Sequence, residues 1–104
     1  MARQNKRDWF QDRDGVWSIY KHPDDTDKYD FSFNFGKLNC VDVMIDTVEV
    51  IDVKQISVSN VLVQNNLVNI TVDGAGYPGE CTLKLTLDDG RVKHTVRRFL
   101  NRDR

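Results

Sequence analysis

The stretch from Thr71 to Phe99 constrains the fold most, because apolar and polar side chains alternate along much of it with a period of two. From its cysteine onward, the apolar positions are Cys81, Leu83, Leu85 and Leu87. This alternation is typical of a β-strand that buries one face. Asp89-Gly90 follows, and this dipeptide favours a tight hairpin turn because both residues tolerate a positive φ. The expected cross-strand pairs are Leu87 with Val92, Leu85 with His94, and Leu83 with Val96.

Two further segments predict strands of the same kind. Aromatic and polar residues alternate from Tyr29 to Phe35, which favours a strand whose aromatic face lies in the core. Residues 61–72 predict a hairpin that turns at Asn65-Asn66. Between residues 40 and 53 the β-branched pattern changes phase, which indicates either a bulge or two short strands. The expected pairs of the second hairpin are Val63 with Val68 and Val61 with Ile70.

The chain has 104 residues, which favours a single domain. Short strands separated by turn signals, without helical periodicity of useful length, predict an all-β antiparallel β-sandwich. We expect the sandwich to span residues 21–104 and to end in a basic segment. Residues 1–20 are expected to form an extended N-terminal arm, in which residues 16–20 are a candidate first strand. The predicted core contains Tyr29, Phe31, Phe33, Val61, Val63, Val68, Ile70, Leu83, Leu85 and Val96.

The charges are unevenly distributed, although the formal net charge is only −1. Between residues 21 and 53 there are eight acids and three bases, whereas residues 91–104 contain six bases and one acid. The small net charge argues against general affinity for nucleic acids. The separated charges suit contacts between complementary patches of neighbouring copies or partners. The alternative is a solvated surface with an unstructured basic tail.

The sequence lacks the segments that would direct a chain into or across a membrane, and this bears on the compartment in which the protein folds. No apolar run approaches the length that spans a membrane, and the residues after Met1 are polar and basic rather than a signal segment. We therefore expect the protein to fold in the cytosol, without a membrane partner. Cys40 and Cys81 are too few for a disulfide scaffold, so reduced thiols are expected. A late disulfide, formed after release to an oxidising medium, is the alternative.

The sequence contains no catalytic constellation. His94 is expected on the apolar face of the last hairpin as a neutral core histidine, and His22 has nearby acids but no second group of ligands. Residues 24–27 lack the ligand spacing of a calcium loop. The glycine-rich run 73–76 joins β-patterns, whereas a phosphate loop must open a helix. We therefore expect no enzyme activity, no metal and no cofactor.

The arm before His22 holds both tryptophans of the chain, outside the best strand patterns. Aromatic residues of this kind anchor interfaces, because they bury a large area at low entropic cost. The arm therefore either docks on a neighbouring subunit or folds back onto its own sandwich. Under the docking hypothesis, the partner-binding residues are Trp9, Phe10, Trp17, Arg3, Lys6, Arg7, Arg98 and Arg102.

The order of short motifs resembles a known family. The motifs are Pro23-Asp24-Asp25, the strand from Tyr29 to Phe35, Gly74 to Gly79 with Cys81 to Leu87, Gly90-Arg91, and the closing Arg98 to Arg104. Over about residues 22–104 the chain resembles the small immunoglobulin-like structural proteins of tailed-bacteriophage virions. The aromatic arm before His22 and Cys81 at the start of the last hairpin depart from that pattern. The resemblance implies an immunoglobulin-like β-sandwich and a non-enzymatic role.

The resemblance also implies partners and a location. The expected function is to decorate or stabilise the capsid of a bacteriophage through protein–protein contacts, in many copies or as a homo-oligomer. The partners would be the major capsid protein or other virion proteins, with synthesis in the host cytoplasm. Two alternatives are a neck or tail component and an adhesin module on the virion that binds a host-surface carbohydrate. Exposed aromatics at Tyr77 or Trp17 would serve the adhesin.

Overall fold

The computed structural model describes residues 9–74 and 78–101, and its regular elements there are all β-strands. Within that part of the chain, no helix has the length and apolar character needed to cross a membrane. The prediction of an all-β chain is confirmed. The strands are β1 (Phe10–Gln11), β2 (Trp17–Lys21), β3 (Thr26–Ser32), β4 (Lys37–Leu38), β5 (Val41–Asp42), β6 (Ile45–Lys54), β7 (Ser57–Gln64), β8 (Leu67–Asp73), β9 (Gly79–Leu87) and β10 (Val92–Asn101).

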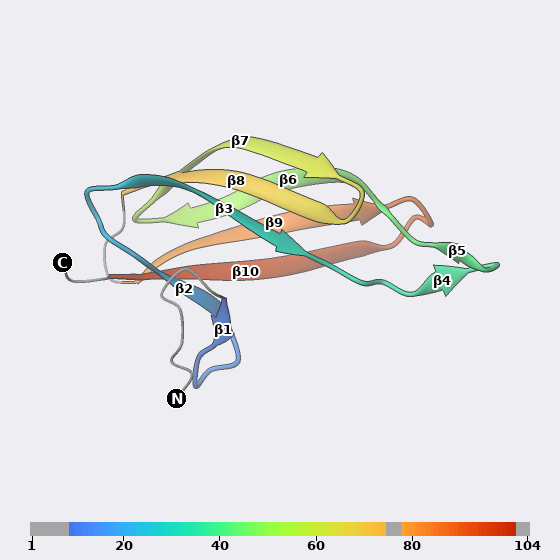
Figure 1. The fold of residues 1–104 in the computed structure, drawn as a ribbon, viewed down its shortest axis with the longest axis horizontal. Coiled ribbons are helices and arrows are strands. Elements are labelled where there is room, and N and C mark those ends of the chain that lie inside the picture. Colours follow the sequence, from blue (N-terminus) through green and yellow to red (C-terminus); the bar gives the residue numbers. More distant parts are fainter. Residues whose placement is uncertain (1–8, 75–77, 102–104) are drawn as a thin grey trace, which may run out of the picture.

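The strands form two main sheets that lie face to face (Figure 1). The larger sheet has the order β1-β2-β10-β9-β6, and the smaller has the order β3-β8-β7. A separate two-stranded hairpin joins β4 to β5. Among the described strand pairs, β2 with β10 is parallel and the others are antiparallel. The two facing layers enclose one apolar core, so the chain has the character of a β-sandwich.

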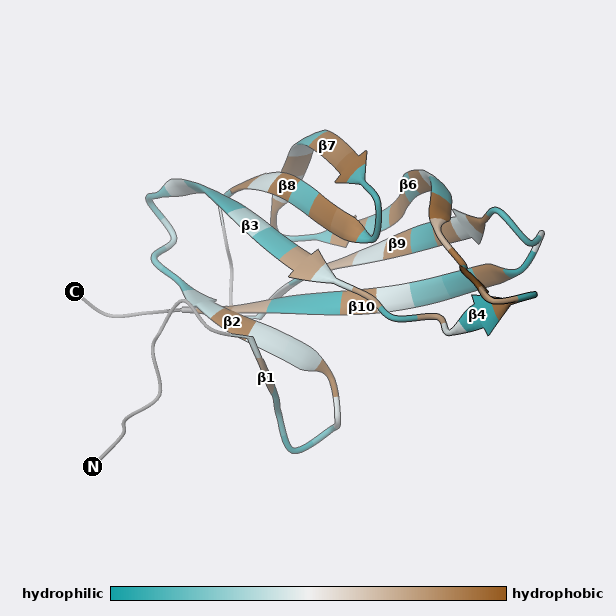
Figure 2. Ribbon diagram, turned by 45° about the vertical axis from the view of Figure 1, so that its right-hand side comes forward, coloured by the Kyte–Doolittle hydropathy of each residue, from teal (hydrophilic) through white to brown (hydrophobic). Residues whose placement is uncertain are grey.

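The core lies between the two sheets and follows the period of the strands. Every second residue of β9 is buried, from Gly79 through Leu87, as the alternation predicted. β8 shows the same alternation between hydrophobic and hydrophilic residues in Figure 2. Burial of each such aliphatic side chain stabilises the fold by about 1.5–3 kcal/mol. The buried cluster contains Ile19, Tyr29, Phe31, Val43, Ile45, Ile56, Val68, Ile70, Val72, Cys81, Leu83, Leu85, Leu87 and Phe99.

The last hairpin forms as predicted, but its register differs by one residue. Val92 pairs with Thr86 and Thr95 pairs with Leu83. The loop contains three residues rather than two, because the Leu87 N–H donates to the Arg91 carbonyl at 2.9 Å. Gly90 has a φ of 92°, the left-handed conformation that closes such a three-residue loop. The carboxylate of Asp89 also accepts from the backbone N–H and Nε of Arg91.

This shift turns every side chain of β10 to the opposite face, because side chains alternate with a period of two. His94 is therefore exposed, and its predicted place in the core is wrong. Val96 is 37% exposed, so its predicted place in the core is also wrong. Arg97 and Phe99 point into the molecule instead and are buried.

The second hairpin has the predicted register next to its turn and a bulge farther away. Val63 pairs with Val68, and Asn65 adopts a φ of 56° at the turn. A register shift between Ser59 and Leu62 interrupts the ladder, so no regular pair joins Val61 to Ile70. Val63 lies on the edge strand β7 and remains 36% exposed, so it is not part of the buried core.

Of the two predicted causes of the phase change after residue 40, the structure shows the bulge, because the shifts lie inside one long strand and not between two short ones. The chain forms the short strand β5 and then β6, and β6 itself has register shifts between Ile45 and Thr47 and between Val50 and Asp52. The aromatic strand is shorter than predicted, because β3 ends at Ser32. Phe33 and Phe35 lie beyond that end, stack on each other at 5.4 Å and pack partly buried against the core.

The predicted N-terminal arm contributes strands to the larger sheet. β1 pairs with β2, and β2 pairs in parallel with the end of β10. The candidate strand at residues 16–20 corresponds to β2, which crosses the expected boundary after residue 20. The arm from Phe10 onward is therefore integrated in the sheet, and residues 1–8 lie outside the described part.

Candidate functional site

A pocket of about 470 Å³ opens at one edge of the space between the two sheets. Arg97 comes from β10, Trp17 comes from β2, and Phe31 with Phe33 comes from the end of β3 and the segment that follows it. Trp9, the residue just before β1, lines the same pocket. The complete lining is Trp9, Trp17, Asp30, Phe31, Ser32, Phe33, Asn34, Leu67 and Arg97.

Arg97 lies among four aromatic rings. Its guanidinium carbon Cζ is 4.1 Å from the centre of the Phe31 ring and 5.0 Å from that of Trp9. The corresponding distances to Phe33 and Trp17 are 5.4 Å and 5.9 Å. These separations lie within the range of cation–π attraction. The side chain is only 5% exposed, so the rings and not water surround most of this cation.

The polar partners of Arg97 do not neutralise its charge. Its Nε donates to the Thr95 hydroxyl at 3.2 Å. In the described part of the chain, no carboxylate forms an ion pair with the guanidinium. Burial lowers the pKa of Arg97 to about 10, and the interaction with Cys81 opposes this shift. The group is still protonated at neutral pH, so the pocket contains an uncompensated positive charge.

Trp9 packs on the core of its own chain. Its indole Nε1 donates to the Asp30 carbonyl at 2.8 Å. Its ring meets Phe31 and Phe99 edge-on, with centroids 5.5 Å and 5.8 Å apart. Of the two possibilities for the arm, this geometry favours the one in which it folds back onto its own sandwich. Docking of Trp9 on a neighbouring subunit stays a hypothesis.

Trp17 and Phe10 lie on opposite faces of the larger sheet. Trp17 is opposite Arg97 in the parallel ladder, faces the pocket and remains 42% exposed at its rim. Phe10 is half-buried and stacks on Tyr20 with centroids 5.4 Å apart. Among the predicted partner-binding residues, Trp17 therefore has the geometry of a side chain that can contact a ligand.

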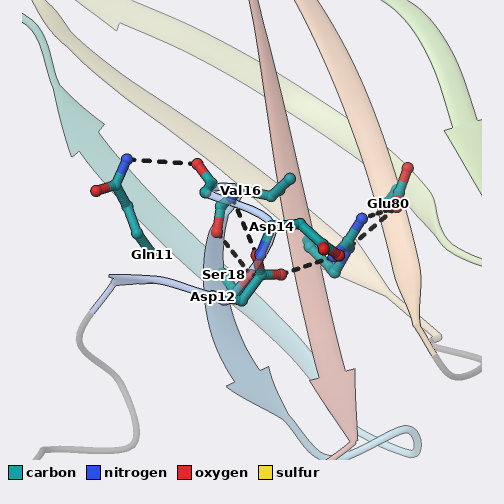
Figure 3. A network of polar contacts seen from close by, with 8 residues as sticks. Gln11, Asp12, Asp14, Val16, Ser18 and Glu80 are labelled. Carbon is teal, nitrogen blue, oxygen red and sulfur yellow. Dashed lines mark hydrogen bonds and ion pairs between the residues drawn. The ribbon is translucent and has the colours of Figure 1, made fainter.

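Arg98 is engaged within its own chain by Asp12, Asp14 and Glu80, the three acidic residues that Figure 3 labels. Its Nη1 donates to Asp12 at 2.7 Å and to Asp14 at 3.3 Å, while Nε and Nη2 donate to Glu80 at 3.0 Å and 2.9 Å. The hydrogen bond to Glu80 contributes most to raising the pKa of Arg98. Arg98 thus ties the β1–β2 loop to β9 and β10.

Asp12 organises the loop in this network. Its carboxylate accepts the backbone N–H groups of Asp14 and Val16 and the hydroxyl of Ser18. Partial burial alone would raise the pKa of Asp12. These hydrogen bonds, together with the one from Arg98, outweigh that effect and hold the pKa below its ordinary value of 3.8. The network is a structural brace and leaves Arg98 little freedom to bind a partner.

The remaining predicted residues are not gathered into a site. Arg3, Lys6, Arg7 and Arg102 lie outside the described residues. The Nδ1 atom of His22 lies 3.9 Å from the Asp24 carboxylate, whereas His94 is exposed on β10. Across residues 9–74 and 78–101, no three histidine, cysteine or acidic side chains are grouped so that they could hold a metal ion. Cys40 is exposed, Cys81 is buried, and both are free thiols.

Two buried cations were missed from the sequence, namely Arg97 and Lys21. Lys21 is 1% exposed, and its ammonium donates to the carbonyls of His22 and Asp25. Desolvation lowers its pKa. Both residues share an inward-facing parity with an apolar neighbour two positions away, Lys21 with Ile19 and Arg97 with Phe99. Extending the alternation through these pairs would have identified them.

The pocket brings together a cation and aromatic faces that a ligand can contact. Arg97 stays protonated at neutral pH, so it supplies a fixed positive charge, and the hydroxyl of Ser32 and the carboxylate of Asp30 lie in the same lining. A fixed cation that lines a pocket with aromatic walls, and whose terminal nitrogens make no hydrogen bond in the described structure, is suited to holding an anionic ligand of flat or ring-like shape. Comparisons of this chain with protein-family models, with curated proteins and with solved structures found no match.

Proposed function

We infer that the two sheets form an immunoglobulin-like sandwich. In that fold one sheet contains strands B, E and D, and the other contains C, F and G. When β3, β6, β7, β8, β9 and β10 are assigned to B, C, D, E, F and G, the orders β3-β8-β7 and β10-β9-β6 correspond to this arrangement. The β2 strand pairs in parallel with β10, so it lies beside strand G, whereas the constant-type fold places strand A beside strand B.

This assignment differs from antibody domains in its cross-link. Those domains join strands B and F by a disulfide. Here β9 carries Cys81 on its buried face, but β3 has no cysteine and presents Tyr29 and Phe31 inward. Cys81 is a free thiol in an apolar setting. The sandwich is therefore stabilised by apolar packing, which is compatible with folding in a reducing compartment.

We propose that this protein is a non-enzymatic structural component of a tailed-bacteriophage virion that decorates or stabilises the capsid through protein–protein contacts. The order of motifs in the sequence and the inferred immunoglobulin-like topology support this role. The major capsid protein or another virion protein would be the partner, with many copies on the particle. The observation that carries the proposal is the hairpin formed by β4 and β5.

This hairpin extends away from the two main sheets at one end of the molecule (Figure 1). Its tip is a tight turn in which Asn39 and Cys40 have φ values of 53° and 64°. Leu38 and Val41 pair beside the turn and are 55% and 67% exposed. A projecting turn usually carries polar residues, whereas an exposed apolar pair suits insertion into a partner.

The test measures binding to particles that lack the protein. Leu38→Ser together with Val41→Ser should reduce occupancy on such particles while leaving the melting temperature close to that of the unmodified chain. Leu62→Ser is the matched control, because Leu62 is 64% exposed on the edge strand β7. Unchanged occupancy of the double variant would refute docking through this hairpin, and absence of the unmodified protein from purified virions would refute the proposed function.

A second candidate is an adhesin module on the virion that binds a host-surface carbohydrate. The specific observation in its favour is the half-exposed Trp17 at the rim of an aromatic pocket. Aromatic faces with a few polar neighbours are common linings of small-molecule sites. This candidate uses a different surface from the β4–β5 hairpin, so the two roles can be tested independently.

A further inference from the structure

The charge of Arg97 needs an explanation beyond folding. Taking an arginine out of water is costly unless an anion or well-placed acceptors compensate it. Four aromatic rings offset part of that cost, and one hydroxyl accepts from Nε. Within the described residues, no carboxylate completes the arrangement, although sixteen acids occur in the chain. The cation is thus held in place without a counterion.

The geometry limits what the counterion can be. The aromatic rings surround the guanidinium, and Nε is already bonded to Thr95. In the described structure, the nitrogens Nη1 and Nη2 make no hydrogen bond, and Arg97 lines an open pocket. Two parallel N–H donors of this kind match the two oxygens of a carboxylate.

The rest of the pocket suits a ring with hydroxyl groups. Trp17 offers a half-exposed aromatic surface 5.9 Å from the Arg97 Cζ, against which the C–H face of a sugar can pack. Ser32 and Asn34 line the same pocket and are exposed, so they can exchange hydrogen bonds with hydroxyls. The volume of about 470 Å³ lies within the range of small-ligand sites.

These observations favour a carboxylated sugar over two other ligands. A neutral sugar would leave the charge of Arg97 uncompensated. An acidic peptide side chain would meet Arg97, but it would make no use of the aromatic face and the polar rim together. Asp30 also lines the pocket, but it is exposed, so water screens its repulsion of an anion.

We propose that this pocket binds a sugar of the uronic-acid class, with its carboxylate on the Nη1 and Nη2 edge of Arg97 and its ring against Trp17. The proposal names a ligand class for the adhesin candidate and rests on that candidate alone. It is independent of docking through the β4–β5 hairpin, which is measured on particles.

The first experiment titrates the purified full chain with methyl β-glucuronide and with methyl β-glucoside, recording tryptophan fluorescence and amide NMR shifts. The glucuronide should bind saturably and at least about tenfold more tightly than the glucoside, since a hydrogen bond to a charged group contributes that much. Higher salt should weaken the glucuronide complex. Shifts should be centred on residues 31–34 and on Trp17.

The second experiment uses variants whose folding is checked by amide NMR. Arg97→Lys keeps the charge but lacks the two-pronged donor, and it should lose most of the preference for the glucuronide. Trp17→Leu should weaken both sugars, because it removes the stacking surface from a position that is already half-exposed. Arg13→Met is the matched control, since Arg13 is exposed and outside the pocket, and it should bind like the unmodified chain.

Three outcomes would overturn the proposal. They are equal affinity for the glucuronide and the glucoside, absence of saturable binding at millimolar concentrations, and tighter binding of N-acetyl-glutamate amide than of the glucuronide. The last result would assign the pocket to an acidic side chain of a protein partner. None of these outcomes bears on particle occupancy, which is tested with the substitutions at Leu38 and Val41. Failure of the sugar-binding proposal is therefore distinguishable from failure of the capsid role.

Discussion

The guanidinium carbon of Arg97 lies 4.1 Å from the centre of the Phe31 ring, which joins the two sheets through a cation and an aromatic face. Arg97 belongs to β10 of the larger sheet and Phe31 to β3 of the smaller one. Elsewhere the sheets meet through apolar side chains such as Leu83 and Ile70, and through the edge contact of Tyr29 with Phe99. One edge of the core therefore ends in a charged, aromatic pocket.

The register of the last hairpin predicts which side chains stabilise the fold. Leu85→Ala should lower the free energy of unfolding by about 2–5 kcal/mol, because Leu85 is 1% exposed and its loss leaves a cavity. Val96→Ala should cost less than about 1 kcal/mol, because Val96 faces solvent. Urea denaturation of both variants measures the difference. Equal losses would indicate the two-residue turn and not the three-residue loop.

Trp9 should contribute to the stability of the isolated chain. Trp9→Ala removes the edge contacts with Phe31 and Phe99 and the hydrogen bond to the Asp30 carbonyl. We expect a loss of about 2–4 kcal/mol, near the lower end for core tryptophans because the side chain is only half-buried. Denaturation measures this loss of stability, and Phe10→Ala, on the outer face of the larger sheet, is the control. An unchanged stability with lost particle binding would support docking on a neighbouring subunit instead.

The brace around Arg98 should weaken in acid. The pKa of Asp12 is below 3.8 in the folded chain, so folding favours its ionised form. This stability is complete above the ordinary pKa and is lost as the pH falls through the lower folded pKa. The difference in stability between the unmodified chain and Asp12→Asn should thus be constant from pH 8 to 5 and shrink below about pH 4.

The control for the acid experiment is Asp52→Asn, because Asp52 is exposed on the edge strand β6 and outside the network. Its difference from the unmodified chain should be small throughout. If Asp12→Asn and Asp52→Asn behave alike between pH 5 and 2.5, the brace does not contribute to stability. Thermal unfolding followed by circular dichroism provides the measurement.

The two thiols should differ in reactivity. Burial raises the pKa of Cys81 to about 12, so little thiolate exists at pH 8 and the side chain is inaccessible. Cys40 is exposed at the turn between β4 and β5. Native protein should therefore release one equivalent of chromophore from a disulfide reagent, and unfolded protein two. Cys40→Ser should abolish the native reaction, whereas rapid labelling of that variant would contradict the burial of Cys81.

Local patterns in the sequence determined the strands and much of the core. The alternation around Leu83 and Leu85 identified a strand with one buried face, and the Asn65 turn placed Val63 opposite Val68. Such patterns are local, because the period of two and the conformations available at turn residues are properties of a few neighbouring residues. The all-β architecture follows from their repetition along the chain.

The length of the last hairpin loop and the packing between the sheets determined where Arg97 and Trp9 lie, and these two residues line the candidate site. Asp89-Gly90 permits loops of two or three residues, and the longer one turned Arg97 inward and His94 outward. Whether Trp9 covered its own core or remained available depended on the position of Phe31 and Phe99, which belong to different sheets. The sequence determined which residues alternate along each strand. The tertiary structure alone determined which face of β10 is buried, because the length of the loop sets the register in which β10 pairs with β9.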